Sequence, residues 1–167
     1  MINIFLFGGS NPTSKLIKKN FHKYIKNVNL LSFSRKDQND YNFDLNNSIY
    51  PEEMEKNGDN IYISLTPIWL FVPFLENYLR RDKGNKIKAL IVISSTSALT
   101  KKYSWNKFDK NLSKKLSYWE DKLIEISKIY KLSLTIIRPT LIYGNFDKDE
   151  DKNISILRKI LRRSPFL

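Results

Sequence analysis

Short runs of consecutive apolar residues alternate along this chain with longer stretches in which apolar residues recur every three or four positions. The short runs are typical of strands buried on both faces of a parallel sheet, and the longer stretches of amphipathic helices. The pattern predicts strands at 2–7, 28–34, 41–45, 60–65, 88–94 and 133–137. It predicts helices that begin after Asn11 and that span 68–80, 109–130 and 153–163. Strands that alternate with helices predict a doubly wound parallel sheet with helices on both faces.

The turn after the first predicted strand reads Gly8-Gly9-Ser10-Asn11. Asn11 can cap the helix that follows, and Pro12 fits a first helical turn, where no amide donor is needed. A helix that begins directly after a strand presents free amides and the positive end of its dipole to a pyrophosphate. We therefore predict a phosphate-binding site here, although a Gly-Gly turn taken alone is more often a simple connection.

Composition excludes several classes of site. The 167 residues suit one domain, 41% of them are apolar, and the chain has no cysteine and a single histidine. Disulfides, a cysteine nucleophile and a histidine-based metal site are therefore not expected, and we predict no metal site. The longest apolar stretch, 61–75, is shorter than the ~20 residues that a spanning helix needs. We expect a soluble, cytoplasmic protein with no membrane partner.

The formal net charge of +12 makes a basic nucleic-acid-associated protein one alternative. The densest basic clusters, Lys114-Lys115 and 158–163, are not interleaved with aromatic residues as a single-strand binding platform would be. Solvated helix faces explain these two clusters more simply. We therefore rank nucleic-acid binding below the hypotheses developed next.

Four segments, taken together, resemble one family. Three lie at the ends of predicted strands, namely ISLTPIW (63–69), SSTS (94–97) and LTIIRPTLIYG (134–144), and the fourth is the trailing DKNISILRKILRRSPF (151–166). They are similar to the extended and atypical short-chain dehydrogenases/reductases, the NAD-dependent epimerase/dehydratase group that includes nucleoside-diphosphate-sugar epimerase-like members. The resemblance implies a Rossmann-like fold, an NAD or NADP cofactor and a nucleotide-sugar substrate changed by nicotinamide redox chemistry.

The resemblance also implies cofactor contacts. The family's GxxGxxG turn falls here on Gly8, Asn11 and Ser14, so the match is degenerate. Arg35 stands where an NAD-selective fold places an acid, and an arginine can pair with a 2′-phosphate, which points to NADP. A solvated loop that simply begins at Arg35 is the competing interpretation. The family's remaining cofactor positions fall at other strand ends, on Asp44, Leu45, Leu65, Thr66, Ser94, Ser95, Pro139 and Thr140.

The catalytic positions are less clear. In the family, a serine or threonine in the loop after strand five hydrogen-bonds the reacting oxygen, which gives that role to Thr96. Tyr118 and Lys122 match the family's YxxxK dyad literally. The family has a usual spacing between the dyad and the strand that ends before Arg138-Pro139. This spacing instead puts the dyad at Leu112 and Leu116, with Glu120 matching the glutamate that follows the dyad. We favour the spacing argument, and we predict that Tyr118 and Lys122 are not the catalytic pair.

In the family, the segment that corresponds to the last stretch of this sequence, 151–166, continues into further strands and a small substrate domain. We therefore expect residues 1–167 to form a single Rossmann-like domain that lacks a substrate lobe and is incomplete at its carboxyl end. An unfinished sheet leaves an open edge and apolar surface, and both favour association, so an oligomer is possible. Besides the enzyme hypothesis, a non-catalytic dinucleotide-binding sensor or scaffold module remains open.

Overall fold

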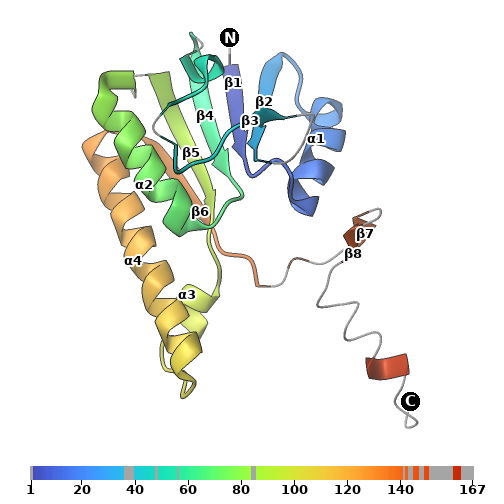
Figure 1. Ribbon diagram of the computed structural model, residues 1–167, viewed down its shortest axis with the longest axis vertical. Helices are drawn as coiled ribbons and strands as arrows, with labels where there is room; N and C mark the ends of the chain where they lie inside the picture. Colours follow the sequence, from blue (N-terminus) through green and yellow to red (C-terminus); the bar gives the residue numbers. More distant parts are fainter. Residues whose placement is uncertain are drawn as a thin grey trace.

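A sheet of six parallel strands forms the centre of the molecule, in the order β3-β2-β1-β4-β5-β6 (Figure 1). The computed structural model describes residues 2–35, 40–47, 49–55, 57–83, 86–140, 142, 145–146, 149–150 and 160–162. The strands are β1 (Ile2–Phe7), β2 (Val28–Ser34), β3 (Tyr41–Asn42), β4 (Asp59–Ser64), β5 (Ile87–Ile93) and β6 (Ser133–Ile137). A separate antiparallel pair, β7 (Asn145–Phe146) and β8 (Asp149–Glu150), follows β6 in the chain.

Helices cover both faces of this sheet. The chain forms α1 (Pro12–Tyr24), α2 (Ile68–Tyr78), α3 (Ser97–Thr100) and α4 (Lys107–Ile129), with a 3-10 turn at Glu52–Glu55 and a π-helical turn at Leu79–Lys83. Of these, α3 packs against α4. The connection through α1 runs across the sheet in one direction, and the connections through α2 and α4 run in the other. Because such crossovers are right-handed, α1 covers one face while α2 and α4 cover the other, as Figure 1 shows. The predicted doubly wound fold is confirmed.

Aromatic rings fill the core between the sheet and α2. Phe7 on β1 lies within 5.2–5.5 Å, centroid to centroid, of four other rings, namely those of Phe33, Tyr62, Phe71 and Phe74. All five side chains are buried. Burial raises the pKa of Tyr62 well above its ordinary value, and the neighbouring Tyr78 adds to this, so the phenol stays neutral. These rings hold β1, β4 and α2 together at the point where the strand order changes direction.

The sheet face on the side of α1, opposite to α2, is covered unevenly. Ile4 and Leu6 on β1 are buried there, whereas Ile61, Ile63 and Ile91 on β4 and β5 are only half-buried. On the edge strand β6, Thr135 and Ile137 on this face are exposed. Parallel sheets are usually covered on both faces, so this half of the sheet is the less protected part of the fold.

Most predicted elements are confirmed, with ends shifted by a residue or two. The strand expected at 41–45 is shorter, because the Asp44 carboxylate accepts hydrogen bonds from the backbone amide of Asn46 (3.0 Å) and from its side chain (2.9 Å), which makes a turn. The long helix α4 begins two residues before the predicted start, where Asn106 caps the amide of Phe108 at 2.9 Å. Of the helix predicted at 153–163, Ile160–Arg162 is helical and the remainder lies outside the described residues.

The aromatic core gives a direct stability test. Phe7→Ala should lower the free energy of unfolding by about 3–5 kcal/mol, because it removes a fully buried ring from the centre of the cluster. Tyr24→Ala is the matched control, since this ring at the end of α1 is largely exposed. Urea unfolding followed by circular dichroism would measure both. Equal, small losses for the two variants would show that the core is not organised around Phe7.

Candidate functional site

The first turn packs directly against the loop that follows β4. Gly8 has a φ of +89°, and a Cβ there would lie 3.1 Å from Thr66 Cγ2 and 3.2 Å from the carbonyl carbon of Leu65. The amides of Gly8 and Gly9 both donate to the carbonyl of Phe33 at 3.0 Å. Any other residue at position 8 would meet both backbone strain and this close approach. The structure thus brings together the predicted residues at the ends of β1 and β4.

Asn11 and Ser14 replace the later glycines of the turn with a hydrogen-bond network. Asn11 Oδ1 accepts from the amide of Ser14 at 2.8 Å, and Asn11 Nδ2 donates to the carbonyl of Leu65 at 3.3 Å. Ser14 Oγ donates to the carbonyl of Gly8 at 2.7 Å. Pro12 has no amide, and the amide of Ser14 is already used by the cap, so this helix end offers fewer donors to an anion than an all-glycine turn would.

A second group of predicted residues meets at the ends of β5 and β6. The amide of Ser94 donates to the carbonyl of Ile137 at 2.8 Å. Thr96 donates to the carbonyl of Pro139 through its amide at 3.1 Å and through Oγ1 at 3.3 Å. Thr140 follows directly. Because β1, β4, β5 and β6 are neighbours, their ends form one row of about 14 Å, given the usual ~4.8 Å between strands.

At the other side of the row, Arg35 and Asp44 lie next to each other. The Arg35 side chain is 64% exposed, and its Nη1 is 3.7 Å from Asp44 Oδ2, a loose ion pair. Leu45, the next residue after Asp44, packs against the core. An exposed guanidinium beside the ends of β2 and β3 can meet an anion that approaches from solvent.

Sequence reasoning missed Asp40. Its buried carboxylate pairs with Lys18 of α1 at 2.7 Å. Asp40 Oδ2 and Ser32 Oγ both lie where a Cβ on Gly9 would project, so only glycine fits at that position. Asp40 sits in an Asn- and Asp-rich loop without periodic pattern, and no spacing rule distinguishes it from its neighbours.

Three polar atoms along this row are buried without a hydrogen-bond partner among the described residues. They are Ser32 Oγ and Asp40 Oδ2 beside the first turn, and Ser94 Oγ at the end of β5. A buried polar group without a partner costs roughly 1–3 kcal/mol, so such groups need an explanation. Because these atoms are enclosed, a small molecule such as a buried water would satisfy them.

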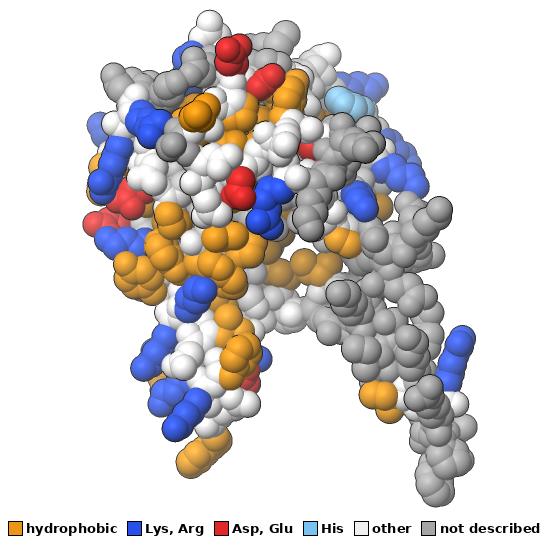
Figure 2. Space-filling view, in the orientation of Figure 1, with side chains coloured by type: hydrophobic (Ala, Val, Ile, Leu, Met, Phe, Trp, Pro, Cys, Tyr) orange, Lys and Arg blue, Asp and Glu red, His pale blue; other side chains and the backbone are white. Residues whose placement is uncertain are grey.

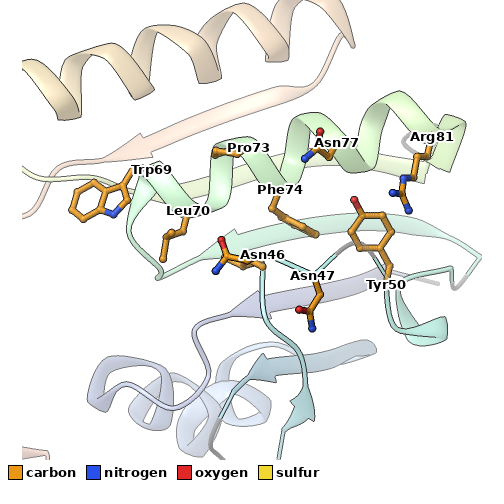
Figure 3. A pocket seen from close by; sticks show the side chains of 10 residues that line it. Asn46, Asn47, Tyr50, Trp69, Leu70, Pro73, Phe74, Asn77 and Arg81 are labelled. Carbon is orange, nitrogen blue, oxygen red and sulfur yellow. The ribbon is translucent and has the colours of Figure 1, made fainter.

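A pocket opens beside the Asp44–Leu45 turn, between the loop after β3 and helix α2 (Figure 3). Its volume is about 220 Å³, below the roughly 300–1,000 Å³ of typical ligand sites, so it suits one ring system rather than a whole cofactor. Apolar side chains and the amides of Asn46, Asn47 and Asn77 line it. At its far end the Arg81 guanidinium stacks over the Tyr50 ring at 5.0 Å.

The literal dyad lies on the outer side of α4. The Tyr118 side chain is 54% exposed, and its ring contacts Trp119 with the centroids 5.0 Å apart. Lys122 pairs with Glu125 at 2.8 Å, and this carboxylate raises the pKa of Lys122. At the positions favoured by spacing, Leu116 is buried and Leu112 is partly buried against the core. Neither leucine can transfer a proton.

The arginine of the Arg-Pro motif is held by Glu120. Arg138 donates through Nε at 3.0 Å to both carboxylate oxygens of Glu120 and through Nη2 at 2.7 Å. The hydrogen bonds to Glu120 raise the pKa of Arg138, so the guanidinium stays charged. The Glu120 side chain is only 5% exposed. This forked pair fixes the end of β6, and with it the Pro139–Thr140 loop, against α4.

No protein-family model and no curated protein sequence matches the chain. Solved structures do match. The Bacillus anthracis dTDP-glucose 4,6-dehydratase in complex with NAD has a TM-score of 0.65 at 16% identity, over 97% of this chain and 62% of the dehydratase. The yeast methylglyoxal/isovaleraldehyde reductase complexed with NADPH has a TM-score of 0.66 at 12% identity, over 99% of this chain and 67% of the reductase. The chain shares the Rossmann fold of these proteins.

Its length differs from theirs. This chain spans about three fifths of the dehydratase. It covers 84% of an oxidoreductase from Lactococcus lactis, and 96% of this chain takes part in that match, which has a TM-score of 0.55 and 15% identity.

Within the described residues, no helix is long and apolar enough to cross a bilayer, and no cluster of acidic or histidine side chains could hold a metal ion.

The pair of the buried Glu120 with the partly exposed Arg138 should contribute more to stability than a pair in which both side chains are exposed. Arg138→Ala leaves the Glu120 carboxylate buried without its partner and should cost about 3 kcal/mol of unfolding free energy. Arg80→Ala, which removes a largely exposed pair with Glu76, is the control and should change little. Urea titrations of both variants would measure the difference, and a similar effect of the two would contradict this role of Arg138.

Proposed function

We propose that this chain is a dinucleotide-binding domain, which holds NAD or NADP along the row formed by the ends of β1, β4, β5 and β6. The observation that carries the proposal is the meeting of the strand-end loops at one edge, next to the start of α1. In an open α/β sheet, ligands bind at the strand ends where the strand order changes direction, here between β1 and β4. The NAD-bound and NADPH-bound proteins of the same fold support this ligand class.

The pocket beside Leu45 suits the adenine end of the cofactor. Its volume fits one ring system, and its asparagine amides can donate to and accept from the edge of a base. The diphosphate would then lie over Gly8–Asn11 at the start of α1, and the nicotinamide near Ser94, Thr96 and Pro139. The buried polar atoms of Ser32, Asp40 and Ser94 border this path.

As an activity, we propose a reductase, epimerase or dehydratase acting on a small carbonyl compound or a nucleotide sugar. The bound nicotinamide would supply hydride transfer. In this chain, the Thr96 hydroxyl would exchange its 3.3 Å hydrogen bond to the Pro139 carbonyl for one to the reacting oxygen. The Glu120–Arg138 pair would position the loop beside it. No proton-transferring side chain is assigned among the described residues.

A second candidate function is a non-catalytic module that senses the cofactor or serves as a scaffold. Leu112 and Leu116 favour it, because both positions expected for the acid/base dyad carry apolar side chains packed at the core. The two candidates share the cofactor site and differ only in turnover. Binding without turnover on carbonyl substrates or nucleotide sugars would select the module.

Cofactor binding can be tested by titrating NADH and NADPH and following their fluorescence. Leu45→Ala should weaken both by roughly fivefold to tenfold, because the adenine ring loses one apolar contact worth about 1 kcal/mol. Leu99→Ala is the matched control, since Leu99 is exposed and lies on α3. Failure of the wild-type chain to bind either cofactor would reject the proposal.

Arg35 and Asp40 would favour different cofactors. An arginine at this place suits the 2′-phosphate of NADP, and a free carboxylate suits the ribose hydroxyl of NAD. The exposed Arg35 can pair with a 2′-phosphate, whereas the Asp40 carboxylate is already paired with Lys18. We therefore propose a preference for NADP. Arg35→Ala should weaken NADPH roughly ten- to a hundredfold, since a charge-assisted pair is worth ~1.5–3 kcal/mol, and should leave NADH nearly unchanged. If Asp40→Asn instead raises NADPH affinity while Arg35→Ala affects both cofactors equally, Asp40 sets the specificity.

A further inference from the structure

Four large apolar side chains are exposed within ten residues of sequence, between α3 and the start of α4. Trp105 is fully exposed, and the exposed fractions of Tyr103, Phe108 and Leu99 are 84%, 73% and 62%. We call residues 97–110 the aromatic tip. Large apolar groups that gather on a surface usually mark an interaction site. The row of strand-end loops that would hold the cofactor does not use these four side chains.

The aromatic tip is also basic. Between residues 97 and 110 the chain carries four lysines and one aspartate, a formal net charge of +3. Lys101 pairs with Asp109 at 2.7 Å, and Lys102 lies over the Tyr103 ring at 5.6 Å from its centroid. Lys114 and Lys115 continue the positive charge along α4. In Figure 2, basic and hydrophobic side chains lie next to each other on the part of the molecule that α3 and α4 form.

The tip projects from the molecule. Figure 1 shows that α3 and the beginning of α4 lie beyond the edge at which the strands end, so that the tip forms one extremity of the fold. A projecting surface of this kind can contact a flat partner. Sites for single-stranded nucleic acid, in contrast, are grooves that follow the backbone.

We propose that the aromatic tip docks on an anionic lipid surface. Tryptophan and tyrosine favour the interface between lipid and water, and lysines that keep their charged ends in water are attracted to acidic headgroups. Trp105, Phe108 and Leu99 insert among the headgroups, while Lys102, Lys107 and Lys110 contact the lipid phosphates. The protein lies on the bilayer and does not cross it. The expectation of no membrane partner considered only spanning segments.

Cosedimentation of the full chain with lipid vesicles tests this directly. Wild-type protein should bind vesicles of phosphatidylcholine mixed with phosphatidylglycerol much more strongly than vesicles of phosphatidylcholine alone. The double variant Trp105→Ala/Phe108→Ala should lower the partition coefficient about tenfold or more, because it removes most of the inserted apolar area. Lys102→Glu/Lys107→Glu should remove the preference for phosphatidylglycerol and lower binding to these vesicles by at least about tenfold.

Tyr24→Ala is the matched control, since Tyr24 is exposed and has Lys23 beside its ring, but lies at the end of α1. It should bind as the wild type does. Tryptophan emission should shift to shorter wavelength on vesicle binding, and Trp105→Phe should keep the binding and lose most of that shift. Because all the substituted side chains are exposed, circular dichroism should show unchanged folding.

Three results would overturn the proposal. The first is no preference of the wild type for phosphatidylglycerol. The second is equal vesicle binding by the wild type and by Trp105→Ala/Phe108→Ala. The third is binding of single-stranded RNA that depends on Trp105 and Phe108, with no binding to vesicles, which would assign the aromatic tip to nucleic acid.

Discussion

The close contact between the first turn and the loop after β4 determines where a ligand can bind to this fold. The β1–β4 ladder pairs Phe7 with Ser64, and the amide of Leu65 continues it with a 3.0 Å bond to the Phe7 carbonyl. Gly8 then turns away with a positive φ, against the backbone of Leu65. From this point α1 and α2 run to opposite faces of the sheet. Neither of these two helices therefore covers the strand ends between them.

The sequence predicted the fold well because buried parallel strands leave a strong apolar signal. Runs such as 2–7 and 88–94 have few alternatives, and the Asn11-Pro12 start of α1 follows from capping chemistry. The prediction failed where a side chain outweighs periodicity, as when Asp44 forms a turn and ends β3 early. Local pattern cannot show such a choice, because it depends on which polar group is near enough to bond.

The candidate site was predictable in part for the same reason. Residues that follow a strand directly, such as Gly8, Thr66 and Thr96, are placed by the strand itself, so their meeting at one edge could be predicted. Asp40 could not, because its place beside Gly9 depends on the pairing with Lys18 across a loop. The aromatic tip was missed for another reason. Its apolar residues look like core in a linear sequence, and only the fold shows that Trp105 and Phe108 face solvent.

The central claim is that the row of strand ends binds a dinucleotide, and amide NMR during a titration with NADPH tests it most directly. The account predicts that the largest shift changes fall on the amides of Gly8–Ser10, Leu65–Thr66 and Ser94–Thr96, with smaller changes at Asn46 and Asn47. It also predicts that resonances of the α4 outer face, around Tyr118 and Lys122, stay in place. Saturable changes confined to α4, or no changes at the strand ends, would contradict it.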